Sequence, residues 1–363
     1  MTQSLLQRFF PPPKFLKMPI TGIDISDESV HLAELSYTSK GRIIKKIDKR
    51  LIPQGLIEKG HIKDIEKVKK FFIQLRKDFN LKYINVSLPE QHGYVVVVRI
   101  PKVQPKEIYN TLELQIEEYV PIPVEEAVFG YDIVQGGDTE DDLAFIELNV
   151  TVYPREILDE YNSVFSGTGI NPLRFEVEAH AVSRAVVPKG DKGTFMILDF
   201  GKTRTGITIA SKEAVRFTST VNVGGDTITR ALARSFSISF DEAETLKKEK
   251  GFLIGKGDQN ILLALMPTVS ALKDEIGKHY QYWNTHTSSF GKKRPKIDHI
   301  LLCGGLANLS GLPEYLASNL HTDVQVANIF TNLNSFDNYI PSIDFKDSLQ
   351  YAASVGLALS SDR

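Results

Sequence analysis

Two acidic turns with the same build stand in the two halves of the chain. Asp24 and Asp199 each end an apolar strand-like run and are followed by a short polar turn and a second alternating run. The small and hydroxyl residues behind the two aspartates are Ser26, Ser29, Gly201, Thr203 and Thr205. Backbone amides of such a turn form an anion-binding concavity, and a carboxylate can hold a hydrated cation. Two such turns facing each other would grip a nucleoside triphosphate with its Mg²⁺. For either turn alone, the alternative is an aspartate that bonds only to its own backbone.

The composition excludes several classes of protein. With 363 residues, 42% hydrophobic and 24% charged, the chain is expected to form a soluble globular protein of two or more domains. A net charge of −2 gives no long-range attraction for nucleic acid. Cys303 is the only cysteine, which fits a reducing compartment, and it is interpreted as a buried small residue. No apolar run reaches the ~18 residues of a membrane span, and no signal peptide is found, so we expect a cytoplasmic protein.

The chain must supply the elements that position the two turns, and their order is predicted to occur twice. The predicted elements of the first half are strands 20–26, 29–37 and 42–52, a helix at 63–79 and strand 83–88. Those of the second half are strands 194–200, 204–210, 214–222 and 298–303 and helices 226–236, 241–250, 261–283, 312–320 and 347–359. Period-2 and period-3.6 patterns of apolar residues support these assignments. The repetition predicts a duplicated α/β fold.

A third unit is expected between the halves. It is predicted to hold strand 95–100, helix 105–119, strands 127–134 and 143–153 and helix 154–166, with an acidic hairpin loop at 136–142. The chain is predicted to begin with a tail at 1–18 and a first domain at 19–89, which continues at 171–190 after the inserted α+β subdomain at 90–170. A second domain is predicted at 191–346, with a subdomain at about 223–296, and a C-terminal helix at 347–363. The apolar tail is interpreted either as an anchor to a membrane or partner, or as a segment that packs on its own domain.

Several phrases resemble one protein family. They are Gly-Ile-Asp-Ile at 22–25, Gln-Ile-Glu-Glu-Tyr-Val-Pro at 115–121, Asp-Phe-Gly at 199–201, Gly-Gly-Asp-Thr-Ile-Thr at 224–229, Gly-Gly-Leu-Ala-Asn-Leu at 304–309 and the apolar end at 351–359. This set is similar to the actin-like ATPase superfamily and, within it, to the PilM family of type IV pilus assembly. The phrase at 115–121 falls in the insertion, which separates PilM-like proteins from most other relatives. The resemblance implies a duplicated actin-like (ribonuclease H-like) ATPase fold, with ATP and Mg²⁺ as cofactors.

The resemblance also assigns roles to residues. Asp24 to Ser29 resembles the first phosphate loop and Asp199 to Thr205 the second, with Asp24 and Asp199 holding Mg²⁺ through water. Further contacts to the nucleotide are implied for Gly225, Asp226, Glu244, Lys247, Gly304, Gly305 and Leu309. Gly225 and Asp226 would open a helix whose first amides favour an anion. For Glu244 and Lys247, three residues apart on one helical face, a solvated ion pair is the alternative.

The chain departs from the family pattern in the first loop. Ser26 stands where relatives usually have glycine, and its Cβ restricts the backbone. Asp27 and Glu28 would repel a phosphate unless Mg²⁺ intervenes, and His31 stands where the family often shows lysine. Hydrolysis needs a residue that positions or activates water, and Glu176 is the candidate in the connecting segment. Intrinsic ATPase activity is therefore expected to be weak or absent.

The resemblance implies a scaffold of pilus assembly and twitching motility that links inner-membrane components to a cytoplasmic motor. The implied partner is the N-terminal cytoplasmic tail of a PilN-like inner-membrane protein, docked near the insertion, which would recruit the chain to the membrane. The pilus motor ATPase and a second copy of the chain are further implied partners. Two alternatives remain open: a cell-division protein similar to FtsA, and a small-molecule kinase of the same superfamily, for which we find no substrate signature.

Overall fold

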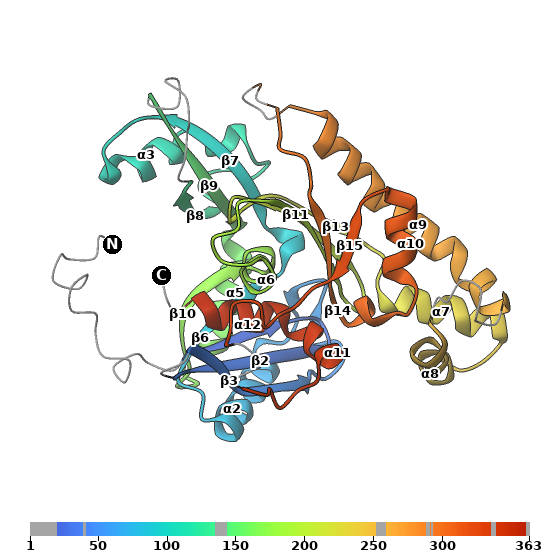
Figure 1. Ribbon diagram of the computed structural model, residues 1–363. Coiled ribbons are helices and arrows are strands. Elements are labelled where there is room, and N and C mark those ends of the chain that lie inside the picture. Colours follow the sequence, from blue (N-terminus) through green and yellow to red (C-terminus); the bar gives the residue numbers. More distant parts are fainter. Residues whose placement is uncertain are drawn as a thin grey trace.

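The computed structural model in Figure 1 shows two halves of similar build with a third unit set on one side. The structure describes residues 20–38, 41–134, 144–251, 259–287, 291, 293–334 and 339–360. The predicted tail at 1–18 and the predicted acidic loop at 136–142 lie outside the described residues.

The first half is built on a five-stranded sheet. Its strands are β1 (Ile20–Ile25), β2 (Ser29–Thr38), β3 (Gly41–Leu51), β6 (Tyr83–Leu88) and β10 (Asn171–Val177), in the order β10-β6-β1-β2-β3. The pairs β1–β2 and β2–β3 are antiparallel, whereas β6 runs parallel to both of its neighbours. A short hairpin of β4 (Ile57–Glu58) and β5 (His61–Ile62) precedes α2 (Ile65–Phe79). Asp64 caps α2 by accepting a hydrogen bond from the amide of Lys67, and Asn80 ends it in the left-handed conformation.

The second half repeats the strand order of the first. Its strands are β11 (Thr194–Phe200), β12 (Thr205–Ser211), β13 (Ala214–Val221), β14 (His299–Gly304) and β15 (Asp323–Val326), in the order β13-β12-β11-β14-β15. Again the first three strands are antiparallel, and β14 runs parallel to β11 and β15. The prediction of a duplicated α/β fold is confirmed, because each sheet has the order third, second, first, fourth, fifth.

Four helices accompany the second sheet. They are α7 (Gly225–Phe236), α8 (Phe240–Lys250), α9 (Gln259–Thr285) and α10 (Leu312–Leu320). The long helix α9 buries Leu265, Val269, Leu272 and Ile276, which recur at three- and four-residue intervals. The long helix predicted at 261–283 is confirmed as α9, and this apolar face covers the core of the second half.

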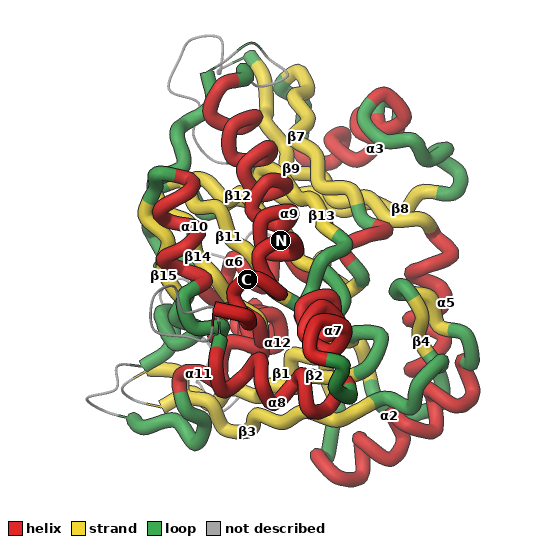
Figure 2. The backbone as a smooth tube through the Cα atoms, turned by 90° about the vertical axis from the view of Figure 1, so that its right-hand side faces the viewer, coloured by secondary structure: helices red, strands yellow, loops and turns green. Residues whose placement is uncertain are grey.

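Two helices join the halves. Figure 2 shows α6 (Glu178–Val186) and α12 (Ala352–Leu359) in the middle of the molecule, between the two sheets. A Cβ on Gly22 of β1 would lie 2.0 Å from the carbonyl oxygen of Ser354, and a Cβ on Gly356 would lie 1.8 Å from that of Ala181. Only glycine allows these close approaches. The predicted helix at 347–359 is interrupted: α11 (Phe345–Ser348) and a 3₁₀ turn at Leu349–Tyr351 precede α12.

The third unit is a three-stranded sheet with helical turns. Its strands are β7 (Tyr94–Pro101), β8 (Ala127–Ile133) and β9 (Phe145–Pro154), in the order β7-β9-β8. The continuous helix predicted for 105–119 is wrong, because the structure has a 3₁₀ turn at Pro105–Glu107, α3 (Ile108–Glu113) and a second 3₁₀ turn at Ile116–Glu118. These short pieces still bury Ile108, Leu112 and Ile116 against the sheet.

The helix that follows the third unit packs in the core of the first half. α5 (Arg155–Phe165) buries Ile157, Tyr161, Val164 and Phe165 in the same core as β1, β6 and α2 of the first half. The sequence-based division assigned 90–170 to the insertion. We propose instead that the inserted unit ends near residue 154, since the side chains of α5 complete the first domain.

Candidate functional site

The two predicted aspartates face each other where the halves meet, a region called the junction below. Asp24 lies near the end of β1, is 8% exposed, and accepts a hydrogen bond of 2.7 Å from the hydroxyl of Ser87. His31 Nδ1 lies 3.7 Å from its other carboxylate oxygen. Asp199 holds the equivalent position in β11. Burial and the nearby charge of Asp24 raise the pKa of Asp199 to about 6.

This pair of carboxylates fits a hydrated divalent cation. Carboxylate oxygens are the donors that Mg²⁺ prefers, and Mg²⁺ usually keeps several of its waters. A cation between Asp24 and Asp199 would remove the repulsion that raises the pKa of Asp199. Within the described part of the chain, no group of three or more His, Cys, Asp or Glu side chains is arranged to hold a metal ion directly.

The first turn uses most of its side chains for its own structure. The hydroxyl of Ser26 lies 3.0 Å from the carbonyl oxygen of Ser29 and 3.1 Å from its hydroxyl. Asp27 accepts hydrogen bonds of 2.9 Å from the amides of Lys59 and Gly60. Glu28 forms an ion pair with a lysine of the second turn. Asp27 and Glu28 therefore have partners within the protein, whereas the sequence suggested that both would repel a phosphate.

The second turn is fixed by close backbone packing. A Cβ on Gly201 would lie 2.9 Å from the carbonyl oxygen of Arg204, so a side chain there would distort the turn. Thr203 is exposed. Thr205 is fully buried, and its hydroxyl donates a hydrogen bond of 2.6 Å to the carbonyl oxygen of Val223. Its side chain therefore anchors the turn, and its contact with a phosphate stays a prediction.

The N-terminus of α7 does not present free amides. Gly225 N donates to Gly201 O at 3.0 Å, and Asp226 N donates to Lys202 O at 2.8 Å. The sequence predicted that these first amides bind an anion, but the structure uses them to hold the second turn. A Cβ on Gly224 would lie 2.6 Å from the carbonyl oxygen of Lys202, which shows how closely the second turn and α7 pack.

Glu244 and Lys247 form a partly buried ion pair and not a solvated one. Lys247 Nζ lies 2.6 Å from Glu244 Oε2 and also donates to Thr229 Oγ1 at 2.8 Å and Gly225 O at 3.3 Å. Burial acts in the opposite direction, but the hydrogen bonds from Lys247 and Thr229 lower the pKa of Glu244. The pair thus ties α8 to the start of α7, beside the second turn. Its contact with a nucleotide stays a prediction.

The glycine pair after β14 lies against the second aspartate. Gly304 has φ +80°, and a Cβ there would lie 2.5 Å from Asp199 Oδ1. Gly305 faces open space, with no heavy atom within 4 Å of a Cβ. The 3₁₀ turn Gly305–Asn308 follows, and Leu309 behind it is buried in the core of the second half. This backbone allows a ligand to approach closely at Gly305.

Three charged side chains near the junction were not singled out from the sequence. Glu178 is the first residue of α6, and burial together with the charges of Asp24 and Asp199 holds its pKa well above the usual range. Arg204 Nη2 lies 3.7 Å from Glu178 Oε2, and Nη1 donates to Gln91 Oε1 at 2.8 Å. Glu90 is 7% exposed, and burial, opposed by Arg204, raises its pKa to about 8.

Glu176, the predicted candidate for activating water, is bound elsewhere. Arg184 donates to both of its carboxylate oxygens, at 3.0 Å for Oε2 and at a shorter distance for Oε1. Arg184 also donates to Gly356 O at 2.8 Å, so the pair braces α6 against α12. Glu178, two residues later, is the carboxylate that the structure places near Asp24 and Asp199.

One signal could have found Ser87 and Glu178. The sequence predicted strand 83–88, and parallel strands bring their carboxyl ends to one edge of a sheet, where ligands bind. Ser87 and Glu178 stand at the ends of β6 and β10, on the same edge as Asp24. Glu90 and Arg204 carry no comparable pattern, because one comes from the start of the insertion and the other from a short turn.

Two sheets of the same strand order, with an aspartate near the end of the first strand in each, define a duplicated actin-like ATPase fold. A family model described as type IV pilus assembly protein PilM matches residues 22–362, and the chain belongs to this family. The described helices include none that is both long and apolar enough to cross a membrane.

Solved structures show the same fold. A structure titled PilM-PilN type IV pilus biogenesis complex is similar with a TM-score of 0.77 and 19% identity, over 96% of this chain and 99% of that chain. The ethanolamine utilization protein EutJ from Carboxydothermus hydrogenoformans is similar with a TM-score of 0.55 and 17% identity, over 96% and 90% of the two chains. MreB5 of Spiroplasma citri bound to ADP has a TM-score of 0.55 and 14% identity, over 96% of each chain.

Proposed function

We propose that the chain is an ATP-binding scaffold of the type IV pilus assembly platform. One observation carries this proposal: Asp24 and Asp199, from two sheets of equal topology, lie close enough for the charge of one to raise the pKa of the other. Such an arrangement is suited to a phosphate chain with its cation. The similar structure of MreB5 bound to ADP has the same fold and supports the proposal of a nucleotide site.

In this proposal different residues of the junction bind different parts of the nucleotide. Asp24 and Asp199 would hold Mg²⁺ through water, and the metal would neutralise phosphate charge. The turns at 26–29 and 201–203 would lie along the phosphates. The nucleoside would lie beside Gly305, between the turn 305–308 and the Glu244–Lys247 pair that fixes α8.

Glu178 is the proposed water-activating residue, and its surroundings account for slow hydrolysis. Burial and the nearby aspartates raise its pKa and so favour the protonated carboxyl, and a protonated carboxyl cannot accept a proton from water. Arg204, 3.7 Å away, favours the charged form but does not overcome burial and the neighbouring aspartates. A bound cation would add positive charge near Asp24 and Asp199 and would lower this pKa. We therefore propose weak activity that depends on the metal.

The membrane partner is proposed to bind where the inserted unit meets α5 and α2 of the first domain. A cavity of about 680 Å³ opens where β8 begins and β9 ends, against α5 and α2. The acidic residues that line it are Glu125, Glu126, Glu156, Asp159 and Glu160. Ile65 adds an apolar side chain, and Arg155 is the one lysine or arginine among the lining residues. This chemistry suits a short tail that carries both apolar and basic residues.

The proposed occupant is the N-terminal cytoplasmic tail of a PilN-like inner-membrane protein. The similar structure whose title names a PilM-PilN complex supports this choice. Binding of such a tail would bring the chain from the cytoplasm to the inner membrane. The pilus motor ATPase and a second copy of the chain stay as further proposed partners.

Calorimetry of ATP binding with Mg²⁺ tests the first part of the proposal, and absence of binding would refute it. A tail peptide from the partner tests the second part. Replacing Glu156 and Asp159 by Gln and Asn should weaken binding of the peptide and leave ATP binding unchanged, since both residues are exposed on α5 and line the cavity. Equal peptide affinity in this double variant and in the native chain would place the docking site elsewhere.

A further inference from the structure

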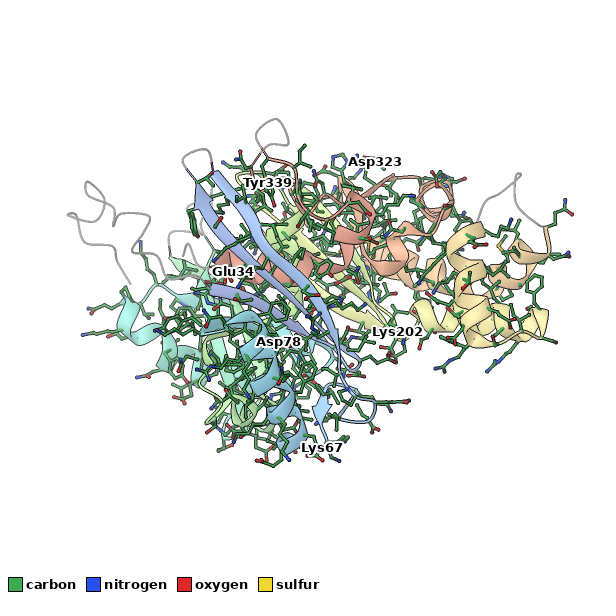
Figure 3. All side chains as sticks on the ribbon, turned by 90° about the horizontal axis from the view of Figure 1, so that it is seen from below. Glu34, Lys67, Asp78, Lys202, Asp323 and Tyr339 are labelled. Carbon is green, nitrogen blue, oxygen red and sulfur yellow. The ribbon has the colours of Figure 1, made fainter. Side chains whose placement is uncertain are left out.

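The two turns of the junction are joined by an ion pair. Lys202 of the second turn is paired with Glu28 of the first, and both side chains remain accessible, at 54% and 42% exposure. Figure 3 shows Lys202 between the strands of the first half and the helices of the second. This pair is the outer contact between the turns, whereas Asp24 and Asp199 lie deeper.

Other ammonium groups gather around the same place. Lys49, at the end of β3, donates to Gln350 Oε1 at 3.1 Å, and Lys248 of α8 lies 3.5 Å from Glu244 Oε1. Burial, with the charges of Lys202 and Lys248, lowers the pKa of Lys49. Lysines from three separate elements thus converge on the outer side of the junction. The carboxylates that offset them there are Glu28, Asp226 and Glu244.

The inner and outer sides of the junction therefore differ in charge. The inner side carries Asp24 and Asp199, whose charges repel an anion that arrives without a cation. The outer side carries three lysines: Lys248 is paired with Glu244 of its own helix, and Lys202 is paired with Glu28 of the first turn. The oxygens of a polyphosphate are negatively charged, as the Glu28 carboxylate is, and they carry a higher charge density. They can therefore replace this carboxylate as the acceptor for Lys202.

We propose that Lys202, supported by Lys49 and Lys248, binds the polyphosphate tail of the nucleotide, and that Glu28 is an internal competitor which the phosphates displace. The inference rests on the proposed nucleotide site and names a cation that the sequence did not single out. Lys202 leaves Glu28 at low cost, because exposed ion pairs contribute little to stability. His31 lies buried against Asp24, so the outward-facing cation at this place is Lys202 of the second turn.

The proposal makes opposite predictions for the two partners of the ion pair. Glu28→Gln keeps the shape of the side chain and removes the competing charge, so affinity for ATP should rise about two- to fivefold. Lys202→Gln removes a charged donor to phosphate, so affinity for ATP should fall at least about tenfold. AMP, which lacks the polyphosphate, should bind all variants alike. Lys106→Gln, on an exposed turn of the insertion, is the matched control.

Titration calorimetry with ATP, ADP and AMP in the presence of Mg²⁺ tests this inference on the full chain. A gain in affinity for Glu28→Gln cannot come from misfolding, so it supports the proposal even where Lys202→Gln is unstable. If the native chain binds ATP and Glu28→Gln binds no tighter, the competition is refuted. If Lys202→Gln weakens AMP as much as ATP, Lys202 does not bind the polyphosphate. A native chain that binds no nucleotide would overturn the proposed function and this inference together.

Discussion

Asp199→Asn is expected to stabilise the folded protein at pH 8 when neither nucleotide nor metal is present. Burial and Asp24 raise the pKa of Asp199 to about 6, whereas an unperturbed aspartate has a pKa of about 3.9. Between these two values the folded chain binds the proton more tightly than the unfolded chain does. Stability therefore falls as the pH rises through this window, and above it the loss amounts to about 3 kcal/mol. Asparagine has nearly the same shape and no charge, so it should recover up to about that amount.

The assay is urea unfolding of the two proteins with EDTA, at pH 8 and at pH 4.5. At pH 8 the free energy of unfolding should be about 1–3 kcal/mol higher for Asp199→Asn. At pH 4.5 the difference should be much smaller, because Asp199 in the native chain is then protonated when folded. Asp132→Asn, an exposed position on β8, is the control and should change stability little at either pH.

A second measurement separates the metal site from simple charge removal. Mg²⁺-ATP at a hundred times its Kd should stabilise the native chain by about 2.7 kcal/mol. Asp199→Asn should lose most of this gain, since one of the two carboxylates that hold the hydrated cation is gone. The variant would thus be more stable without ligand and less stabilised by it. A variant that is no more stable than the native chain at pH 8 would refute the raised pKa of Asp199.

Three further changes are predicted. Gly356→Ala should destabilise the fold by about 1–3 kcal/mol in urea unfolding, because its Cβ would meet a carbonyl oxygen of α6 at 1.8 Å. Gly304→Ala should weaken ATP binding in calorimetry, because φ is +80° and the Cβ would meet the aspartate of β11. Glu178→Gln should abolish phosphate release while ATP still binds, and Glu176→Gln should lower stability and leave phosphate release measurable. Phosphate release unaffected by Glu178→Gln would exclude it as the water-activating residue.

Local pattern was sufficient to predict much of the fold. The strand predicted at 194–200 is β11, and the helix predicted at 312–320 is α10. Both follow from apolar periodicity, which depends on neighbours within one element. The prediction of one helix at 105–119 failed because two 3₁₀ turns and the short α3 bury the same apolar residues at helical spacing, so the period does not distinguish them from one continuous helix.

The sequence by itself determined the duplication, the two aspartates and the family, because each is carried by residues close together in the chain. Only the tertiary structure decided what surrounds those aspartates. Glu178 reaches them because β10 runs parallel beside β6, and Lys202 meets Glu28 because two similar halves face each other. It also decided that the amides of Gly225 and Asp226 are consumed by the second turn. Such contacts join residues that are far apart in the chain, and no local period records them.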